Sequence, residues 1–119
     1  MSAARAAIVA QVTPPLEAAG VKVEPYSRNT VVDENTVMVR LDRVVKAPPW
    51  RTYDAALLVL VPQQVPGNAD DELDALLEDV LHALDRSRVR WSTAARSVFE
   101  TGAHCYEVTL SVPLNITQE

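Results

Sequence analysis

The pattern of apolar and polar positions predicts a helix near the start of the chain. One apolar residue recurs at every fourth position, the spacing of a buried helical stripe: Ala4, Ile8, Val12 and Leu16. Pro14 and Pro15 fall inside this stripe, and proline removes a backbone donor and crowds the preceding helical turn. We therefore expect a helix over residues 2–19 that kinks or restarts at the prolines and ends at Gly20.

Five strands are predicted in the rest of the chain. Apolar and polar residues alternate over 21–25 and over 36–45, which indicates two half-buried strands. Residues 55–61 are apolar throughout, as in a central strand that is covered on both faces. Residues 89–112 predict two long strands, and the turn at Thr101-Gly102 favours a hairpin between them.

A second helix is predicted over residues 70–86. Its apolar residues have the spacing of one buried stripe: Leu73, Leu76, Leu77, Val80, Leu81 and Leu84. Asn68 or Asp70 is suited to cap its start, acidic residues fill its first turns, and Arg86 follows its end, as the helix dipole favours.

The predicted order is helix, strand, strand, strand, helix, strand, strand. Short turns between successive strands imply a mostly antiparallel sheet of about five strands, with both amphipathic helices packed on one face. We therefore expect a single α+β domain over residues 1–119.

Composition narrows the function classes. The 119 residues carry a net charge of −5, which argues against a dedicated nucleic-acid binder. The longest apolar run, 55–61, falls far short of the roughly 20 residues that span a bilayer, so we expect no membrane partner. No secretory signal is apparent, and the single cysteine excludes an internal disulfide. These features predict a soluble domain made inside the cell.

No residue pattern indicates catalysis, a cofactor or a metal site. His104 and Cys105 suggest a base and a nucleophile, but neighbours on a strand point to opposite faces. His82 lies opposite the leucine stripe, where a solvated side chain is the simpler interpretation. The acids of 70–74 are compatible with calcium, yet they lack the glycine and the terminal glutamate of an EF-hand loop. We expect no enzyme activity.

Other residues are candidates for contact with a partner. Arg43, Lys46 and Arg51 flank loops or strand ends and are placed at a subunit or tube interface. Trp50 and Trp91 fit two alternatives, an interface hot spot or a half-buried tryptophan at the edge of the core.

Charge is also segregated along the chain. Six acids, Asp71 and Asp74 among them, lie between residues 70 and 79, and a basic segment with Arg88 follows. One interpretation is a solvated helix followed by an ordinary basic loop. The other is head-to-tail pairing of copies, with the acidic helix of one against the basic edge of the next, which closes into a ring.

The layout resembles the tail terminator proteins of long-tailed bacteriophages, especially those of actinobacterial hosts. The resemblance covers nearly the whole chain and rests on five segments: AAGVKVEPY, WRTYDAALLVLVP, ADDELDALLEDVLHAL, VRWSTAARSV and GAHCYEVTLSV. It implies a structural virion protein, assembled in the host cytoplasm, that forms a homo-oligomeric ring of typically six subunits. Such a ring sits at the head-proximal end of the tail tube.

The resemblance further implies three partners. The ring stops polymerisation of the tail tube protein, offers a docking surface for a head-completion or connector protein, and lets DNA pass through its lumen. Two alternatives stay open: another phage neck or minor tail protein, and a small α+β ligand-binding or regulatory module, which needs a concave pocket with convergent polar groups.

Overall fold

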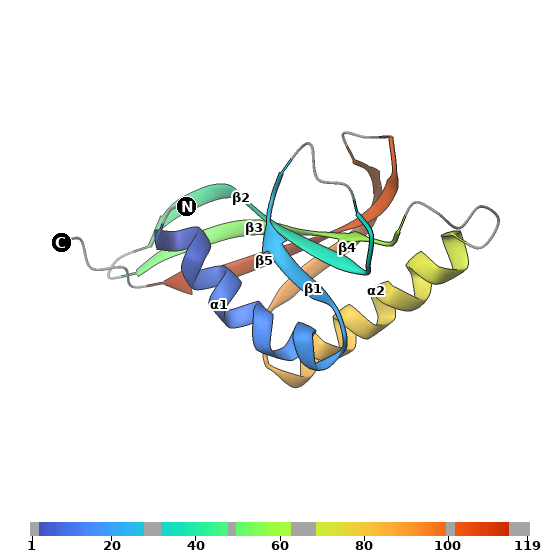
Figure 1. Ribbon diagram of the computed structural model, residues 1–119. Coiled ribbons are helices and arrows are strands. Elements are labelled where there is room, and N and C mark those ends of the chain that lie inside the picture. The colour runs from blue at the N-terminus through green and yellow to red at the C-terminus, as the bar shows by residue number, and fades with distance from the viewer. Residues whose placement is uncertain (1–2, 28–31, 48–49, 63–68, 100–101, 115–119) are drawn as a thin grey trace.

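The computed structural model describes residues 3–27, 32–47, 50–62, 69–99 and 102–114. Within these ranges the chain forms two helices, α1 (Ala3–Ala18) and α2 (Ala69–Arg86), and one five-stranded sheet (Figure 1). The strands are β1 (Lys22–Pro25), β2 (Thr36–Ala47), β3 (Trp50–Leu60), β4 (Trp91–Val98) and β5 (His104–Leu114). The predicted α+β class and the predicted element order are confirmed.

The sheet has the order β1-β2-β3-β5-β4, which places β3 at its centre. The apolar run that predicted a central strand is the second half of β3, and every residue from Ala55 to Leu60 is buried. β4 and β5 form the predicted antiparallel hairpin, and β5 rather than β4 pairs with β3. β4 is therefore an edge strand of the sheet.

β1 is the exception to the antiparallel pattern, because it runs parallel to β2 with Lys22 opposite Thr36. The backbone N–H of Lys22 donates to the Asn35 carbonyl oxygen at 3.0 Å, so the chain returns to the start of β1 before it enters β2. This return needs the polar segment between the two strands. A tight hairpin would have made the pair antiparallel.

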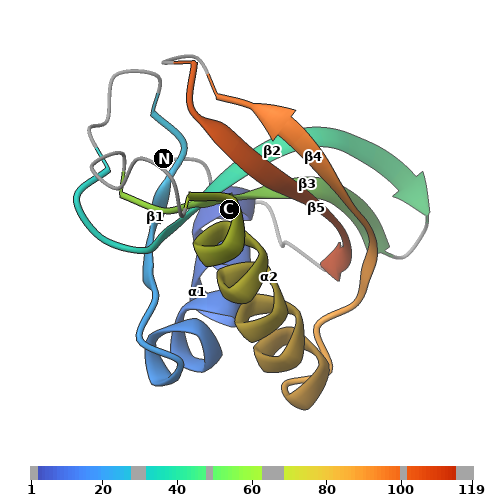
Figure 2. The ribbon, with the colours of Figure 1, turned by 90° about the vertical axis from the view of Figure 1, so that its right-hand side faces the viewer.

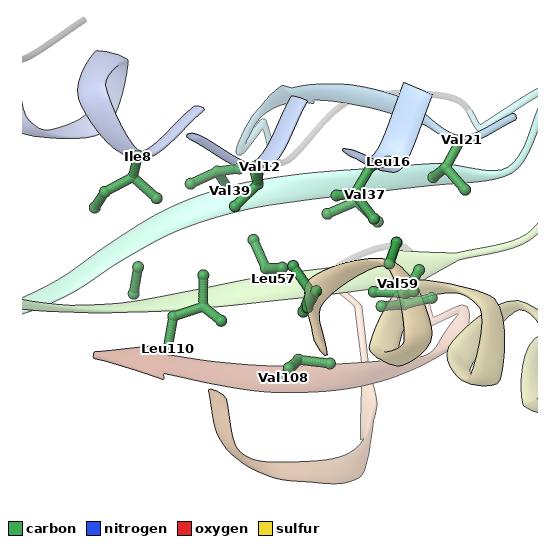
Figure 3. Close-up of a cluster of buried hydrophobic side chains, with 14 of the residues drawn as sticks. Ile8, Val12, Leu16, Val21, Val37, Val39, Leu57, Val59, Val108 and Leu110 are labelled. Carbon is green, nitrogen blue, oxygen red and sulfur yellow. The ribbon is translucent and has the colours of Figure 1, made fainter. Parts of the chain in front are cut away.

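α1 buries its predicted stripe against the sheet, and Figure 3 shows Ile8, Val12 and Leu16 pointing toward Val37 and Val39 of β2. The helix runs unbroken from Ala3 to Ala18, so of the two alternatives expected at Pro14 and Pro15, a kink or a restart, the restart is excluded. Val12 precedes the prolines and Leu16 follows them, and both are fully buried in one core. Burial of each side chain stabilises the fold by about 1.5–3 kcal/mol as an upper bound. This gain holds the turns before and after the prolines in one helix, although each proline removes a backbone hydrogen bond.

α2 lies beside α1 on the same face of the sheet, as predicted (Figure 2). Leu73, Leu76, Val80 and Leu84 are buried, whereas Leu77 and Leu81 are half-buried at the border of the stripe. Neither described helix is long and apolar enough to cross a membrane.

A second, smaller core covers the opposite face of the sheet at one end. It consists of buried residues from four parts of the chain: Val32, Met38, Leu58, Leu60, Phe99, Ala103 and Cys105. Met38 is therefore buried, although the alternation over 36–45 predicted a half-buried strand. From Asp42 to Lys46 the side chains of β2 are exposed, so one strand passes from a doubly covered segment to an open one.

Candidate functional site

The far end of the β2–β3 pair carries half of the predicted interface residues. We call residues 43–47 of β2 and 50–54 of β3 the distal hairpin. In Figure 2 the end of β2 lies away from both helices. Val44 and Val45 are 49% and 39% exposed, which is unusual for large apolar side chains in a strand. The β2 side of the distal hairpin is therefore an uncovered part of the sheet, whereas Tyr53 on the β3 side is buried in the main core.

Arg43 is the one predicted basic residue here with a carboxylate partner among the described residues. Its Nε donates to Asp54 Oδ2 at 2.7 Å, and its Nη2 lies 2.6 Å from the same oxygen. The Arg43 side chain is 70% exposed, so solvent screens the pair and its stabilising effect is small. Asp54 neutralises Arg43 within the chain.

Lys46 and Arg51 are directly opposite one another in the β2–β3 register. Both side chains are exposed, and neither has an ion-pair partner in the part of the chain that the structure describes. Like charges at directly opposite positions destabilise a strand pair by a few tenths of a kcal/mol to about 1 kcal/mol. The repulsion in this pair lowers the stability of the isolated chain. The two positive charges also provide an electrostatic attraction for an external anion.

The N-terminal half of α2 provides acidic groups next to the opposite sheet edge. Asp70 accepts a bond from Arg96 of β4, and Asp74 Oδ1 accepts one from the Tyr106 hydroxyl of β5 at 2.7 Å. That bond raises the pKa of the Tyr106 hydroxyl, since the neutral O–H is the donor to Asp74. Asp74 is thus engaged within the fold, whereas Asp71 is exposed and has no ion-pair partner among the described residues.

The two tryptophans end in different positions. Trp91 is half-buried against the main core, and its Nε1–H donates to Asp85 Oδ1 at 2.9 Å. This contact ties the start of β4 to the end of α2, as expected for a tryptophan at the edge of a core. Trp50 pairs with Ala47 through the register of the distal hairpin, and its side chain lies outside the described residues.

Arg88 occupies a backbone position that usually belongs to glycine. Its φ is 60°, and the Val89 N–H donates to the Leu84 carbonyl oxygen at 3.0 Å, a Schellman motif that ends α2. α1 ends in the same motif with Gly20 at the equivalent position and a φ of 81°. A non-glycine residue in this conformation costs about 1–2 kcal/mol. Exposed Arg88 thus takes a strained place at the rim of a groove.

That groove measures about 480 Å³. Its lining comes from α1, the turn after α2 and the end of β5: Gln11, Ser87, Arg88, Val89, Arg90, Ser111, Val112 and Pro113. Arg88 and Arg90 give it a basic rim, which agrees with the predicted basic segment after α2.

An ion-pair network that the sequence did not indicate lies on the other face of the sheet. Arg40 Nε donates to Asp42 Oδ1 at 2.7 Å, and Arg40 Nη2 donates to Glu107 Oε1 at 2.8 Å. The guanidinium also lies 5.8 Å from the ring centre of Tyr26. These contacts raise the pKa of Arg40, chiefly through Asp42. Arg40 and Glu107 are 67 residues apart, so no local pattern could have paired them.

The residues that were weighed for catalysis are not brought together. Cys105 is 1% exposed, and its neighbour His104 is exposed, as strand alternation predicted. Burial raises the pKa of the Cys105 thiol, which disfavours the reactive thiolate. His82 is exposed, as predicted. Within the described residues, no three His, Cys, Asp or Glu side chains are grouped so that they could hold a metal ion.

A further groove of about 360 Å³ lies between the C-terminal ends of the two helices. Asp79, His82 and Arg86 of α2 line it, together with Pro15 and small residues of α1. It is a concave feature with polar side chains on its wall, although it is open to solvent at the helix ends.

Comparison with protein-family models and with curated proteins gives no relative from which a function can be transferred. No protein-family model matches the chain, and no curated protein matches it. The arrangement of its own surfaces is therefore the basis for a functional proposal.

Proposed function

We propose that the chain is a structural subunit that assembles head to tail with copies of itself into a ring. The ring caps the head-proximal end of a phage tail tube, stops its polymerisation, and offers a docking surface for a head-completion protein. This is the role that the resemblance to tail terminator proteins implies. The observation that carries the proposal is the Lys46–Arg51 pair on the distal hairpin.

The charge distribution favours contacts between different surfaces of two copies. The distal hairpin is basic at Lys46 and Arg51, and the exposed face of α2 is acidic at Asp71. These surfaces belong to different elements, so each copy carries both a basic and an acidic surface. A contact of this kind is heterologous, and it closes into a ring when the rotation between copies closes.

A net charge of −5 also fits a channel for DNA that binds it only in passing. A lumen lined with many lysines and arginines would hold the phosphate backbone and slow its passage. In this proposal the tail tube and the head-completion protein contact the two ends of the ring, and DNA is cargo.

The test is a capping assay with the tail tube protein of a long-tailed phage. Purified tube subunits polymerise alone and in the presence of the chain, and electron microscopy records tube length and the ends of the tubes. The proposal predicts shorter tubes with a ring of density at one end. Tubes of unchanged length with bare ends would contradict it.

A small-molecule binding module is the second candidate, because of the groove beside Asp79, His82 and Arg86. A charged ligand that raises the melting temperature of the wild type, and that fails to do so for Arg86→Ala, would favour this function. The ring proposal predicts no such ligand.

A further inference from the structure

The sheet has two open edges, which differ in character. β4 is the last strand on one side and has no strand beyond it within the described residues. On the other side β1 covers only the first part of β2, from Thr36 to Val39. Residues 40–47 of β2 therefore form a second open edge, which includes the β2 part of the distal hairpin.

β4 carries few of the features that usually protect an edge strand. Natural edges carry lysines, prolines or inward charges that prevent pairing with another chain. The sequence of β4, WSTAARSV, has Arg96 as its one charge, and Arg96 is bonded to Asp70. The register shift in β4 lies at its start, between Trp91 and Thr93, so the remainder pairs regularly. β4 is a long, regular and nearly uncharged edge.

The exposed apolar side chains lie on these same two edges. Among the described residues, the large apolar side chains that are exposed are Val44 and Val45 on the open part of β2 and Val98 on β4. Val98 is 60% exposed. A partner that covers both edges therefore removes this apolar surface from water.

The hairpin turn identifies which backbone groups of β4 face outward. The Phe99 N–H donates to the Ala103 carbonyl oxygen at 2.7 Å, so the backbone groups of these two residues face each other across the hairpin. Hydrogen-bonded and non-hydrogen-bonded pairs alternate along an antiparallel ladder. The backbone groups of Ser97 and Ala95 therefore face β5, and those of Val98, Arg96 and Ala94 face outward.

We infer that the outward groups of β4 pair with the open part of β2, residues 40–47, in a second copy of this chain, so that the sheet continues from subunit to subunit. The inference deepens the proposed ring and rests on it. Complementary charge favours a second copy as the partner. α2 is bonded to β4 and β5 through Asp70 and Asp74, so the exposed Asp71 of α2 lies on the β4 side of the molecule. The open edge of β2 carries the basic residue Lys46. Because the two edges differ, their pairing is heterologous.

The first test removes one outward donor without touching the β4–β5 ladder. Ala94→Pro deletes an N–H that faces away from β5, and proline is tolerated on the solvent side of an edge strand. The inference predicts an intact fold by circular dichroism and loss of the oligomer by native mass spectrometry. The matched change Ala95→Pro deletes a donor that faces β5, and it lowers the melting temperature instead.

Two substitutions at Val98 test the same edge pairing without proline, in case Ala94→Pro does not fold. Val98 is exposed, so Val98→Lys and Val98→Glu leave the core intact. Lysine repels the basic β2 edge and abolishes the oligomer, whereas glutamate retains it. Loss with glutamate but not with lysine, or no loss with either, would overturn the pairing with β2.

Hydrogen exchange measures the pairing directly in the wild type. The amides of Ala94, Arg96 and Val98 exchange more slowly in the oligomer than in the dissociated chain if the edges pair. An oligomer whose amides lack this protection would overturn the edge pairing, but it would not contradict the proposed ring. A chain that stays monomeric at every concentration also overturns edge pairing between free copies, and the capping assay then decides the proposed function separately.

Discussion

Lys46 of β2 lies directly opposite Arg51 of β3, so two positive side chains face each other across the distal hairpin with no carboxylate partner among the described residues. Arg43 and Asp54, also opposite one another, show the arrangement that the hairpin adopts where charge is balanced. The unbalanced pair lowers the stability of the free chain. In the proposed ring, this pair is a surface for an acidic partner.

Lys46→Glu converts this repulsion into an opposite-charge pair with Arg51. We predict that the free energy of unfolding rises by a few tenths of a kcal/mol to about 1 kcal/mol while the oligomer is lost. Urea unfolding and native mass spectrometry measure the two effects. Lys22→Glu, on β1 of the same sheet, is the control and leaves the oligomer intact. If Lys46→Glu lowers stability and assembly together, Lys46 serves the fold.

Arg88→Gly removes backbone strain at the end of α2. We expect a gain of ~1 kcal/mol in the free energy of unfolding, because glycine adopts a φ of 60° without the steric cost. Gly20→Ala is the mirror experiment at the end of α1. A Cβ at Gly20 meets no atom within 4 Å, so the backbone conformation alone lowers the stability. An Arg88→Gly variant that is less stable than the wild type would show that the arginine side chain supports the fold.

The Tyr106–Asp74 bond predicts a dependence of stability on alkaline pH. The pKa of Tyr106 is raised in the folded chain, so its contribution is complete below the unfolded pKa of about 10 and is lost as pH rises through the folded pKa. Tyr106→Phe is therefore less stable than the wild type at pH 7, and the difference shrinks above about pH 10. Urea midpoints at both pH values measure it. Equal midpoints at pH 7 would mean that the bond contributes nothing.

Cys105 is predicted to be unreactive in the folded chain. It is 1% exposed, and its raised pKa keeps it protonated at neutral pH. Iodoacetamide should modify it at the rate at which the second core opens, and rapidly once urea unfolds the chain. Fast modification under native conditions, at a rate that urea does not change, would show that the cover formed by Phe99 and Ala103 is open.

The sequence predicted those parts of the fold that depend on local periodicity. The leucines of α2 and the apolar run of β3 have spacings that one element alone explains, so both were identified correctly. The sequence left a kink and a restart open at Pro14, and it could not exclude the restart, because the burial of Val12 and Leu16 in a shared core is a tertiary effect.

Contacts between residues that are distant in the sequence could not be predicted either, because they too form only through tertiary packing. The bulge between Leu41 and Arg43 sets the register that brings Arg43 opposite Asp54 and Lys46 opposite Arg51, and no local pattern marks a bulge. The basic residues of the distal hairpin were identified, but their pairing was not. Likewise, Asp74 was proposed for an interface, and its partner Tyr106 emerges only when α2 packs on β5.

Native mass spectrometry of the wild-type chain over a series of concentrations tests head-to-tail assembly most directly. We expect one discrete ring mass of more than two copies that grows at the expense of the monomer, because each added copy leaves one surface of each kind open until the ring closes. A stable dimer that never grows would contradict it, because assembly would then stop at a two-fold pairing and not at a larger ring.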